Sequence, residues 1–255
     1  MTPERRHVFG DEGMLALNAA LSAQPLLAFD FDGTLAPIAA RPDEARVAVE
    51  VSRCLERLGR LRPLAIVTGR SVEDVTGRLG FTARFVVGNH GAEEEGRAPT
   101  FDSAPMDAVR ARLDSHAVEF LATGIQVEDK RYSLALHYRL AADRPRAAAR
   151  IEAMLAGLDP MLRCFRGKCV FNVVAADAPD KYDAIVSLVR RAGCGSAVFV
   201  GDDFNDEVVF VCAQPNWLTV RVGRDDLESR AAFFLDCHAE VAVFLERMLR
   251  VLEAA

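Results

Sequence analysis

Two aspartates, Asp30 and Asp32, follow a short apolar run in residues 26–35, which read Leu-Leu-Ala-Phe-Asp-Phe-Asp-Gly-Thr-Leu. A run of this kind, bounded by Pro25 and Gly33, is typical of a buried strand, and side chains two apart leave a strand on the same side. Two carboxylates at the end of a buried strand need a cation. In a doubly wound sheet, ligands bind at the carboxyl ends of the strands. The pair therefore predicts a metal-binding site that also carries a nucleophile.

A turn or a calcium-binding loop is the alternative for this pair. The EF-hand pattern needs Gly at its sixth position and Glu at its twelfth, whereas Gly33 is the fourth residue counted from Asp30. The mismatch argues against an EF-hand and leaves a simple turn open. Three further segments favour the site over the turn.

The first of these is a second acidic segment, which follows an apolar run at residues 197–200 and reads Gly-Asp-Asp-Phe-Asn-Asp-Glu from Gly201. If both apolar runs are strands of one parallel sheet, Asp202 and Asp30 converge at its carboxyl edge. Hard oxygen ligands that leave room for water and substrate suit Mg²⁺. The expected metal ligands are Asp30, Asp32, Asp202 and Asp203.

Helix capping is the alternative for the later residues of this segment. Asn205 is a good N-cap residue, and acidic side chains are favoured in the first turn of a helix. We assign Asp206 and Glu207 to such a cap, and Asp202 to the metal site.

Thr68 and Lys181 are the other two candidates for chemistry. Thr68 ends an apolar run and is followed by Gly69, so its hydroxyl and the neighbouring N–H groups are suited to bind an anion. Lys181 lies in the first turn of an expected helix. A cation there opposes the helix dipole, which suggests that it serves an anion, although a surface lysine is the alternative.

Short apolar strands alternate with helices in the first and last parts of the chain. The expected strands cover residues 26–30, 63–67, 84–87, 197–200 and 217–222. The expected helices cover residues 10–22, 44–60, 71–79, 180–192, 205–213 and a terminal segment from 238. This alternation predicts an α/β fold with a doubly wound, mostly parallel sheet.

The middle of the chain has a different pattern, a helix and two strands that occur twice. The expected elements are a helix at 105–121, strands at 125–128 and 132–138, a helix at 143–157, and strands at 161–165 and 169–174. Polar and apolar residues alternate in these strands, which indicates an antiparallel sheet. We therefore expect an inserted α+β domain at 103–177, its sheet facing the crevice, within a catalytic core formed by 1–102 and 178–255.

Composition excludes several classes of protein. The chain has 255 residues, of which 51% are hydrophobic and 27% charged, with a formal net charge of −6. These values are ordinary for a globular protein, and without a basic stripe they argue against nucleic-acid binding. The N-terminal residues lack the apolar core of a signal peptide or membrane span, so we expect no membrane partner and a cytoplasmic location. The six cysteines have no CxxC spacing and are expected to be reduced core residues.

Four segments together resemble the signatures of the haloacid dehalogenase superfamily in order and spacing: DFDGTL, the strand ending in TGR, the isolated Lys181, and GDDFNDE. The resemblance implies a Rossmann-like core with a C2-type cap inserted between Thr68 and Lys181. It also implies Mg²⁺ and a catalytic set formed by Asp30, Asp32, Thr68 and Lys181. Asp30 is then the nucleophile that forms an aspartyl-phosphate. Asp32 is the acid and base, as in phosphatases and phosphomutases of the superfamily.

A finer resemblance is to the trehalose-6-phosphate phosphatases, on LAFDFDGTLAPI, VTGR, VVGNHGAE, IQVEDKRYSLALHYR and GDDFNDEVVF. The implied reaction is hydrolysis of trehalose 6-phosphate to trehalose and phosphate, with a trehalose-phosphate synthase as a partner in the same pathway. The expected substrate-binding residues are Arg70, Asn89, His90, Glu128, Lys130 and His137. A structural role in its loop is the alternative for His90, and a surface or core contact is the alternative for His137. The chain departs from the family at Asn205, where Thr is more common. It also departs at residues 171–174, where the family has a strand with Glu and Pro, so the sugar contact of that strand is not carried over.

Other functions remain open at this point. C2-capped enzymes that act on sucrose phosphate or mannosyl phosphoglycerate are the nearest alternative, because the cap rather than the core selects the substrate. A phosphomutase needs an activating phosphate and yields an isomer without free phosphate. A sugar-phosphate-binding module without turnover is expected to have lost Asp30, Asp32 or Asp202, and the sequence retains all three.

Overall fold

The structure is a computed structural model that describes residues 6–39, 41–226 and 228–254. It divides the chain into two compact units: Arg97–Pro179, here called the inserted unit, and the remainder, here called the core unit. The sequence predicts an insertion at 103–177, which begins later and ends earlier than the unit in the structure.

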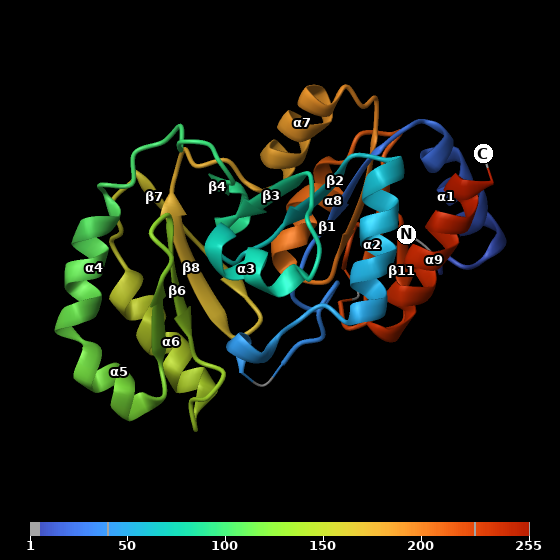
Figure 1. Cartoon of the computed structure of the whole chain (residues 1–255). Coiled ribbons are helices and arrows are strands. Elements are labelled where there is room, and N and C mark those ends of the chain that lie inside the picture. Colours follow the sequence, from blue (N-terminus) through green and yellow to red (C-terminus); the bar gives the residue numbers. More distant parts are fainter. Residues whose placement is uncertain (1–5, 40, 227, 255) are drawn as a thin grey trace. The chain divides into compact units, whose positions relative to one another are not determined.

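The core unit contains a seven-stranded sheet in the order β11-β10-β9-β1-β2-β3-β4. Figure 1 labels β1, β2, β3, β4 and β11 of this sheet. The strands are β1 (Leu26–Phe29), β2 (Leu64–Val67), β3 (Phe85–Gly88), β4 (Glu93–Glu94), β9 (Ala197–Gly201), β10 (Leu218–Val222) and β11 (Phe233–Leu235). All neighbouring pairs are parallel except β3 with β4. The α/β class and the mostly parallel sheet are thus as the sequence predicts.

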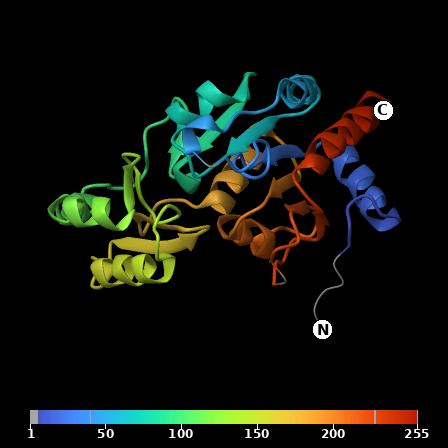
Figure 2. The ribbon, with the colours of Figure 1, turned by 90° about the horizontal axis from the view of Figure 1, so that it is seen from below.

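Helices cover both faces of this sheet, which is why its strands are apolar without alternation. One face packs against α1 (Asp11–Ser22), α2 (Val49–Leu61), α3 (Val72–Leu79) and α9 (Ala239–Glu253). The other face packs against α7 (Lys181–Ala192) and α8 (Glu207–Cys212). Helices α1 and α9, which come from opposite ends of the sequence, lie side by side (Figure 2).

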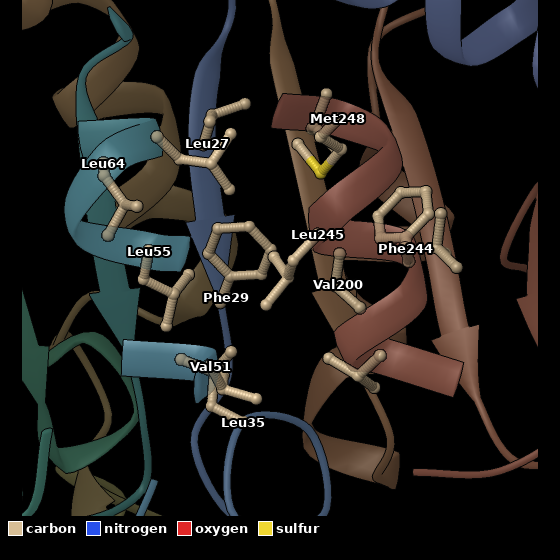
Figure 3. Packing of buried hydrophobic residues seen from close by; sticks show 14 of the residues in the cluster. Leu27, Phe29, Leu35, Val51, Leu55, Leu64, Val200, Phe244, Leu245 and Met248 are labelled. Atoms are coloured by element: carbon tan, nitrogen blue, oxygen red, sulfur yellow. The ribbon is translucent and has the colours of Figure 1, made fainter. Parts of the chain in front are cut away.

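Figure 3 shows part of the apolar packing between β1, α2 and α9. Phe29 of β1 lies beside Leu245 of α9, with Leu55 of α2 nearby, and all three side chains are fully buried. Because Phe29 directly precedes Asp30, this packing fixes the strand end from which the aspartate emerges.

The inserted unit contains α4 (Met106–Ser115), α5 (Ala117–Thr123), α6 (Arg144–Leu155) and a four-stranded antiparallel sheet. Its strands are β5 (Gln126–Asp129), β6 (Ser133–His137), β7 (Leu162–Gly167) and β8 (Val170–Ala175), in the order β5-β6-β8-β7. Leu134, Leu136, Phe171 and Val173 join the helices in one apolar cluster. Because successive side chains of a strand point to opposite faces, the residues that alternate with these four lie on the other face of the sheet.

Two expected helices are shorter or divided in the structure. Residues 45–48 precede α2 in an extended segment, in which Ala45 and Val47 are buried and their neighbours exposed. That alternation suits an extended chain rather than a helix. The expected helix at 105–121 divides at His116, because the carbonyl oxygen of Arg112 contacts the Ser115 hydroxyl and His116 Nδ1. Local bonds of this kind compete with the helical pattern.

The expected helix at 205–213 begins as a 3₁₀ turn, Phe204–Asp206, and continues as α8. Asp203 rather than Asn205 is the N-cap of this turn, so the predicted cap residue is wrong. The strands β4 and β11 have no counterpart in the sequence prediction, because segments of two and three residues are too short to show a period.

The two edge strands of the core sheet are short or covered. At β11, His7 forms a parallel bridge with Phe234, and the N–H of Val8 donates to the carbonyl oxygen of Phe234. At the other edge, β4 consists of Glu93 and Glu94 alone.

The cysteines are free, as expected, but they are not core residues: Cys164, Cys212 and Cys237 are exposed and the other three are half-buried. The prediction relied on the apolar residues next to each cysteine in the sequence, which are typical of buried positions. No helix in the part of the chain that the structure describes is long and apolar enough to cross a membrane.

The packing in Figure 3 predicts a large effect for Leu245→Ala. Its side chain is 0% exposed, and removal of a buried leucine side chain costs about 2–5 kcal/mol of stability. The same change at Leu15, which is 70% exposed on α1, should alter stability by no more than ~0.5 kcal/mol. Urea denaturation of both variants measures the two values, and equal losses would contradict the assigned packing.

Candidate active site

Three buried carboxylates, those of Asp30, Asp202 and Asp206, meet at the carboxyl edge of the core sheet. One oxygen from each lies within 4.8 Å of the others, and the residues are 5%, 3% and 0% exposed. Strand pairing brings them together, because Phe29 of β1 lies opposite Val200 of β9 and the N–H of Asp30 donates to the carbonyl oxygen of Val200 at 2.9 Å. We call Asp30, Asp202 and Asp206 the acidic cluster.

Two glycines make room for the acidic cluster. A Cβ atom at Gly33, which has a φ of +79°, would lie 2.2 Å from a carboxylate oxygen of Asp202. A Cβ atom at Gly201 would lie 2.4 Å from the carboxylate of Asp206. Side chains at these two positions would displace the aspartates, so both glycines are required for the close approach.

Lys181 neutralises part of this charge. Its Nζ lies 2.9 Å from Oδ1 of Asp30 and 2.6 Å from Oδ1 of Asp206. Asp180 and Asp183 form a capping box that begins α7 at Lys181 and holds the lysine backbone in place. The sequence prediction that Lys181 serves an anion therefore agrees with the contacts.

Burial and neighbouring charges shift both groups. Burial raises the pKa of Asp30 well above its ordinary value; Lys181 lowers it, and Asp206 and Asp202 raise it further. Burial lowers the pKa of Lys181, but the carboxylates of Asp206 and Asp30 outweigh burial and raise it, so the ammonium stays charged. The acidic cluster thus has more negative charge than one lysine offsets, and a further cation would favour the ionised form of Asp30.

Asp206 has a larger role than the helix cap predicted for it. Its Oδ2 accepts the N–H groups of Asp202 and Asp203, at 2.8 and 3.0 Å, while Oδ1 accepts from Lys181. The capping prediction is correct but incomplete, because the same carboxylate also lies in the acidic cluster. The spacing in the sequence was a signal for this role, because a side chain four positions after Asp202 can lie next to it when the chain between them forms a turn.

Asp203 and Asp32 lie outside the acidic cluster, although we expected both as metal ligands. Asp203 begins the 3₁₀ turn, and its Oδ2 accepts from Nδ2 of Asn205 at 3.4 Å. Asp32 is directed to a different partner, Arg70.

Arg70 holds Asp32 through two parallel hydrogen bonds. Its Nε and one terminal nitrogen donate to the two oxygens of Asp32, both at 2.7 Å, and the other terminal nitrogen donates to Asp74 at 2.6 Å. The Arg70 side chain is 9% exposed and that of Asp32 is 43% exposed. Two-point pairing of this kind fixes the relative orientation of the two groups. The guanidinium that we expected to bind substrate is therefore bound to Asp32 and Asp74.

Thr68, Asn89 and His90 lie together on adjacent loops of the same edge. The Thr68 hydroxyl accepts the N–H of Arg70 at 3.2 Å, and the Thr68 carbonyl accepts the N–H of His90. Asn89 and His90 both have positive φ angles, and the Asn89 amide donates to Glu93 at 2.7 Å. The His90 ring lies on Gly69, where a Cβ atom would come within 2.4 Å of it.

Glu128, Lys130 and His137, here called the Glu128 group, form a polar cluster on the sheet of the inserted unit. Oε2 of Glu128 lies 3.0 Å from His137 Nε2 and 3.4 Å from Lys130 Nζ. Burial raises the pKa of Glu128, but His137 and Lys130 outweigh it and hold that pKa below its ordinary value. The structure thus brings together the three predicted residues of this unit.

Asn172 is a polar residue of the same sheet that the sequence analysis did not select. It pairs in register with Ala135, which in turn pairs with Glu128, so all three side chains point to one face of the sheet. Asn172 is 2% exposed, and its Nδ2 has no hydrogen-bond partner among the described residues. A buried donor without a partner is costly, and such a donor is suited to an acceptor on a ligand.

The donor set of the acidic cluster fits a small hard cation. Carboxylate oxygens are the ligands that Mg²⁺ prefers, and Mg²⁺ needs few of them because it retains water. Since both oxygens of Asp206 already accept hydrogen bonds, Asp30 and Asp202 are the residues best placed to bind the ion. A carboxylate beside a lysine and a cation is an arrangement able to attack phosphorus.

A comparison with known families identifies the relatives of the chain. The family model Trehalose-phosphatase matches residues 28–232. A trehalose-phosphate phosphatase from Mycobacterium avium is 34% identical over 248 residues, which cover 90% of this chain and 63% of that protein. The corresponding protein of Mycobacterium tuberculosis is 32% identical over 272 residues, covering 96% of this chain and 69% of the relative. The chain thus spans about two thirds of the length of these relatives.

Solved structures agree on the fold. The C-terminal domain of a Candida albicans trehalose-6-phosphate phosphatase superposes with a TM-score of 0.77 at 21% identity, covering 94% of this chain and 96% of that domain. A haloacid dehalogenase-like hydrolase from B. subtilis superposes with a TM-score of 0.64 at 18% identity, covering 87% and 98%. The chain has the fold of haloacid dehalogenase-like hydrolases and belongs to the trehalose-phosphatase family.

Proposed function

We propose that the chain is a Mg²⁺-dependent phosphatase that hydrolyses trehalose 6-phosphate to trehalose and phosphate. The observation that carries the proposal is the acidic cluster with Lys181, in which a buried carboxylate lies at the carboxyl edge of the sheet beside an ammonium group. Membership of the trehalose-phosphatase family supports the substrate.

Asp30 is the nucleophile in the proposed reaction. Its carboxylate attacks phosphorus, the bond from phosphorus to the sugar oxygen breaks, and an aspartyl-phosphate forms on Asp30. Lys181 offsets the negative charge of the reacting group from 2.9 Å away. Mg²⁺ bound at Asp30 and Asp202 would supply further positive charge for the phosphate oxygens.

Asp32 is the acid and base. It protonates the departing sugar oxygen and later takes a proton from the water that hydrolyses the aspartyl-phosphate. Arg70, which donates to both Asp32 oxygens, fixes the orientation of this carboxyl group. Thr68, whose hydroxyl lies beside the same loop, is proposed to contact the phosphate.

Charge stabilisation and the covalent step supply most of the acceleration. Acid–base catalysis contributes about 10²–10⁴-fold, whereas enzymes accelerate phosphate-monoester hydrolysis by up to about 10²¹-fold. The buried acidic cluster and Lys181 are suited to supply most of the rate enhancement, because electrostatic interactions are stronger away from water.

The sugar is proposed to bind through the Glu128 group, with Asn172 as a fourth polar residue on the same sheet face. Together they present carboxylate, ammonium, imidazole and amide groups, which suit the hydroxyls of a disaccharide. Asn89 and His90 are proposed as further contacts from the core unit. A trehalose-phosphate synthase as pathway partner, and the cytoplasm as location, stay predictions from the sequence.

A panel of sugar phosphates, with phosphate release as the readout, tests the function. We expect trehalose 6-phosphate to be hydrolysed most efficiently, and EDTA to abolish the reaction until Mg²⁺ is added back. A preference for sucrose phosphate or mannosyl phosphoglycerate would overturn the substrate but not the chemistry. An isomer formed without free phosphate would indicate a mutase, and binding without turnover would indicate a sensor.

Asp30→Asn should lower kcat by at least about 10³-fold, because an amide cannot act as the nucleophile. The control is Asp11→Asn, at an acidic residue in the first turn of α1 that is exposed, which should leave the rate unchanged. Steady-state kinetics on folded protein measures both. Turnover by the Asp30 variant within about tenfold of the wild type would remove Asp30 from its role.

Glu128→Gln should raise KM for trehalose 6-phosphate roughly tenfold or more, since it removes the charge that pairs with Lys130 and His137. The rate at saturation should change little, because the residue binds the leaving group rather than the phosphate. Glu119→Gln, at an exposed carboxylate of α5 that pairs with Arg150, is the control. An unchanged KM would exclude Glu128 from the sugar site.

A further inference from the structure

Arg221 is a buried cation that the proposed reaction does not use. It lies on β10, directly opposite Gly201 of β9 in the strand pairing, and its side chain is 2% exposed. Gly201 is followed at once by residues 202–207, here called the acidic loop, which contain four acidic side chains. Arg221 therefore lies at the start of the segment that carries two members of the acidic cluster.

The guanidinium of Arg221 binds the last residue of the acidic loop. One terminal nitrogen donates to Oε1 of Glu207 at 3.2 Å, and the other donates to Asp225 at 3.3 Å. The remaining oxygen of Glu207 accepts the N–H of Arg230 at 3.0 Å. Glu207 is thus held both by Arg221 of β10 and by the backbone of Arg230, which lies in the segment after β10.

The acidic loop needs such support because its own charges repel one another. Within the loop, the Asp206 carboxylate accepts the N–H groups of Asp202 and Asp203, which closes the turn. Asp206 is neutralised by Lys181 and the next residue, Glu207, by Arg221. Without the second cation, a half-buried carboxylate would lie beside the buried acidic cluster with only a backbone N–H to hold it.

We propose that Arg221 is a positioning residue of the acidic cluster: by holding Glu207 it fixes the acidic loop, and so sets the affinity of the cluster for a divalent cation. The inference rests on the proposed cation site and goes beyond it, because the Arg221 side chain forms its ion pairs with Glu207, Asp225 and Asp226 rather than with the three cluster carboxylates. Its effect should appear in the binding of Mg²⁺ before it appears in the chemical step.

Arg221→Met removes the charge and keeps the length of the side chain. We expect at least a tenfold rise in the Mg²⁺ concentration at half-saturation, measured by the rise of the melting temperature with MgCl₂ in the absence of substrate. At saturating Mg²⁺ the rate should stay within threefold of the wild type. Arg221→Lys, which can still pair with Glu207, should recover most of the affinity.

Glu207→Gln is the second variant and keeps the inference testable if Arg221→Met does not fold. It preserves the shape of the side chain and weakens the same pair, so Mg²⁺ binding should weaken in the same direction. The matched control is Arg224→Met, at an arginine two residues after β10 whose side chain is 55% exposed and pairs with Asp236; its Mg²⁺ binding should equal that of the wild type.

The outcomes separate this inference from the proposed function. If the wild type gains no stability from Mg²⁺ and releases phosphate equally in EDTA, the cation site itself is wrong. If the wild type binds Mg²⁺ and the Arg221 and Glu207 variants bind it equally well, Arg221 has no positioning role. A lower melting temperature without Mg²⁺, at unchanged Mg²⁺ affinity, would assign the pair to stability alone and would also overturn the inference.

Discussion

The repulsion among three carboxylates, buried and within 4.8 Å of one another, is the constraint on which the rest of the core unit depends. Ionised groups of like charge do not gather out of water unless the surrounding chain leaves them no alternative. Lys181 contacts two of the three, and strand pairing, two glycines and the closed turn at Asp206 supply the rest. The apolar packing of β1 and β9 can be read as the support that this arrangement requires, since neither strand end can shift without separating Asp30 from Asp202.

The aspartates of the site differ in how firmly the surrounding structure holds them. Asp30 and Asp202 directly follow fully buried strands, whereas Asp32 lies two residues further along the chain, is partly exposed and is held by Arg70. This difference suits the two proposed tasks, because a nucleophile benefits from a fixed position and a proton donor must change its charge during the reaction. The sheet of the inserted unit has a third proposed task, because the polar side chains on one of its faces would select the sugar that leaves in the reaction.

The sequence was informative where chemistry coincides with the end of an apolar strand. Asp30, Asp202 and the class of fold could be predicted for this reason, since parallel strands bring their carboxyl ends to one edge whatever the loops do. Lys181 could be predicted for a different reason, because a cation in the first turn of a helix opposes the helix dipole. Contacts between loops were not predictable in this way. The two-point pair of Arg70 with Asp32 and the second role of Asp206 depend on side-chain directions within turns, which spacing alone does not give. Asn172 was missed because its burial, and the lack of a partner for its Nδ2 among the described residues, are visible only once the strands are in register.

The two edges of the core sheet bear on whether the protein aggregates at high concentration. A long parallel sheet with bare outer strands is a template on which other chains can add and aggregate. Here residues 6–8 pair with β11 on one side, and on the other side β4 has only two residues, both glutamates. A strand of two residues and a covered one give a second chain little to extend, so the sheet can be apolar throughout its interior and still resist fibre-like association.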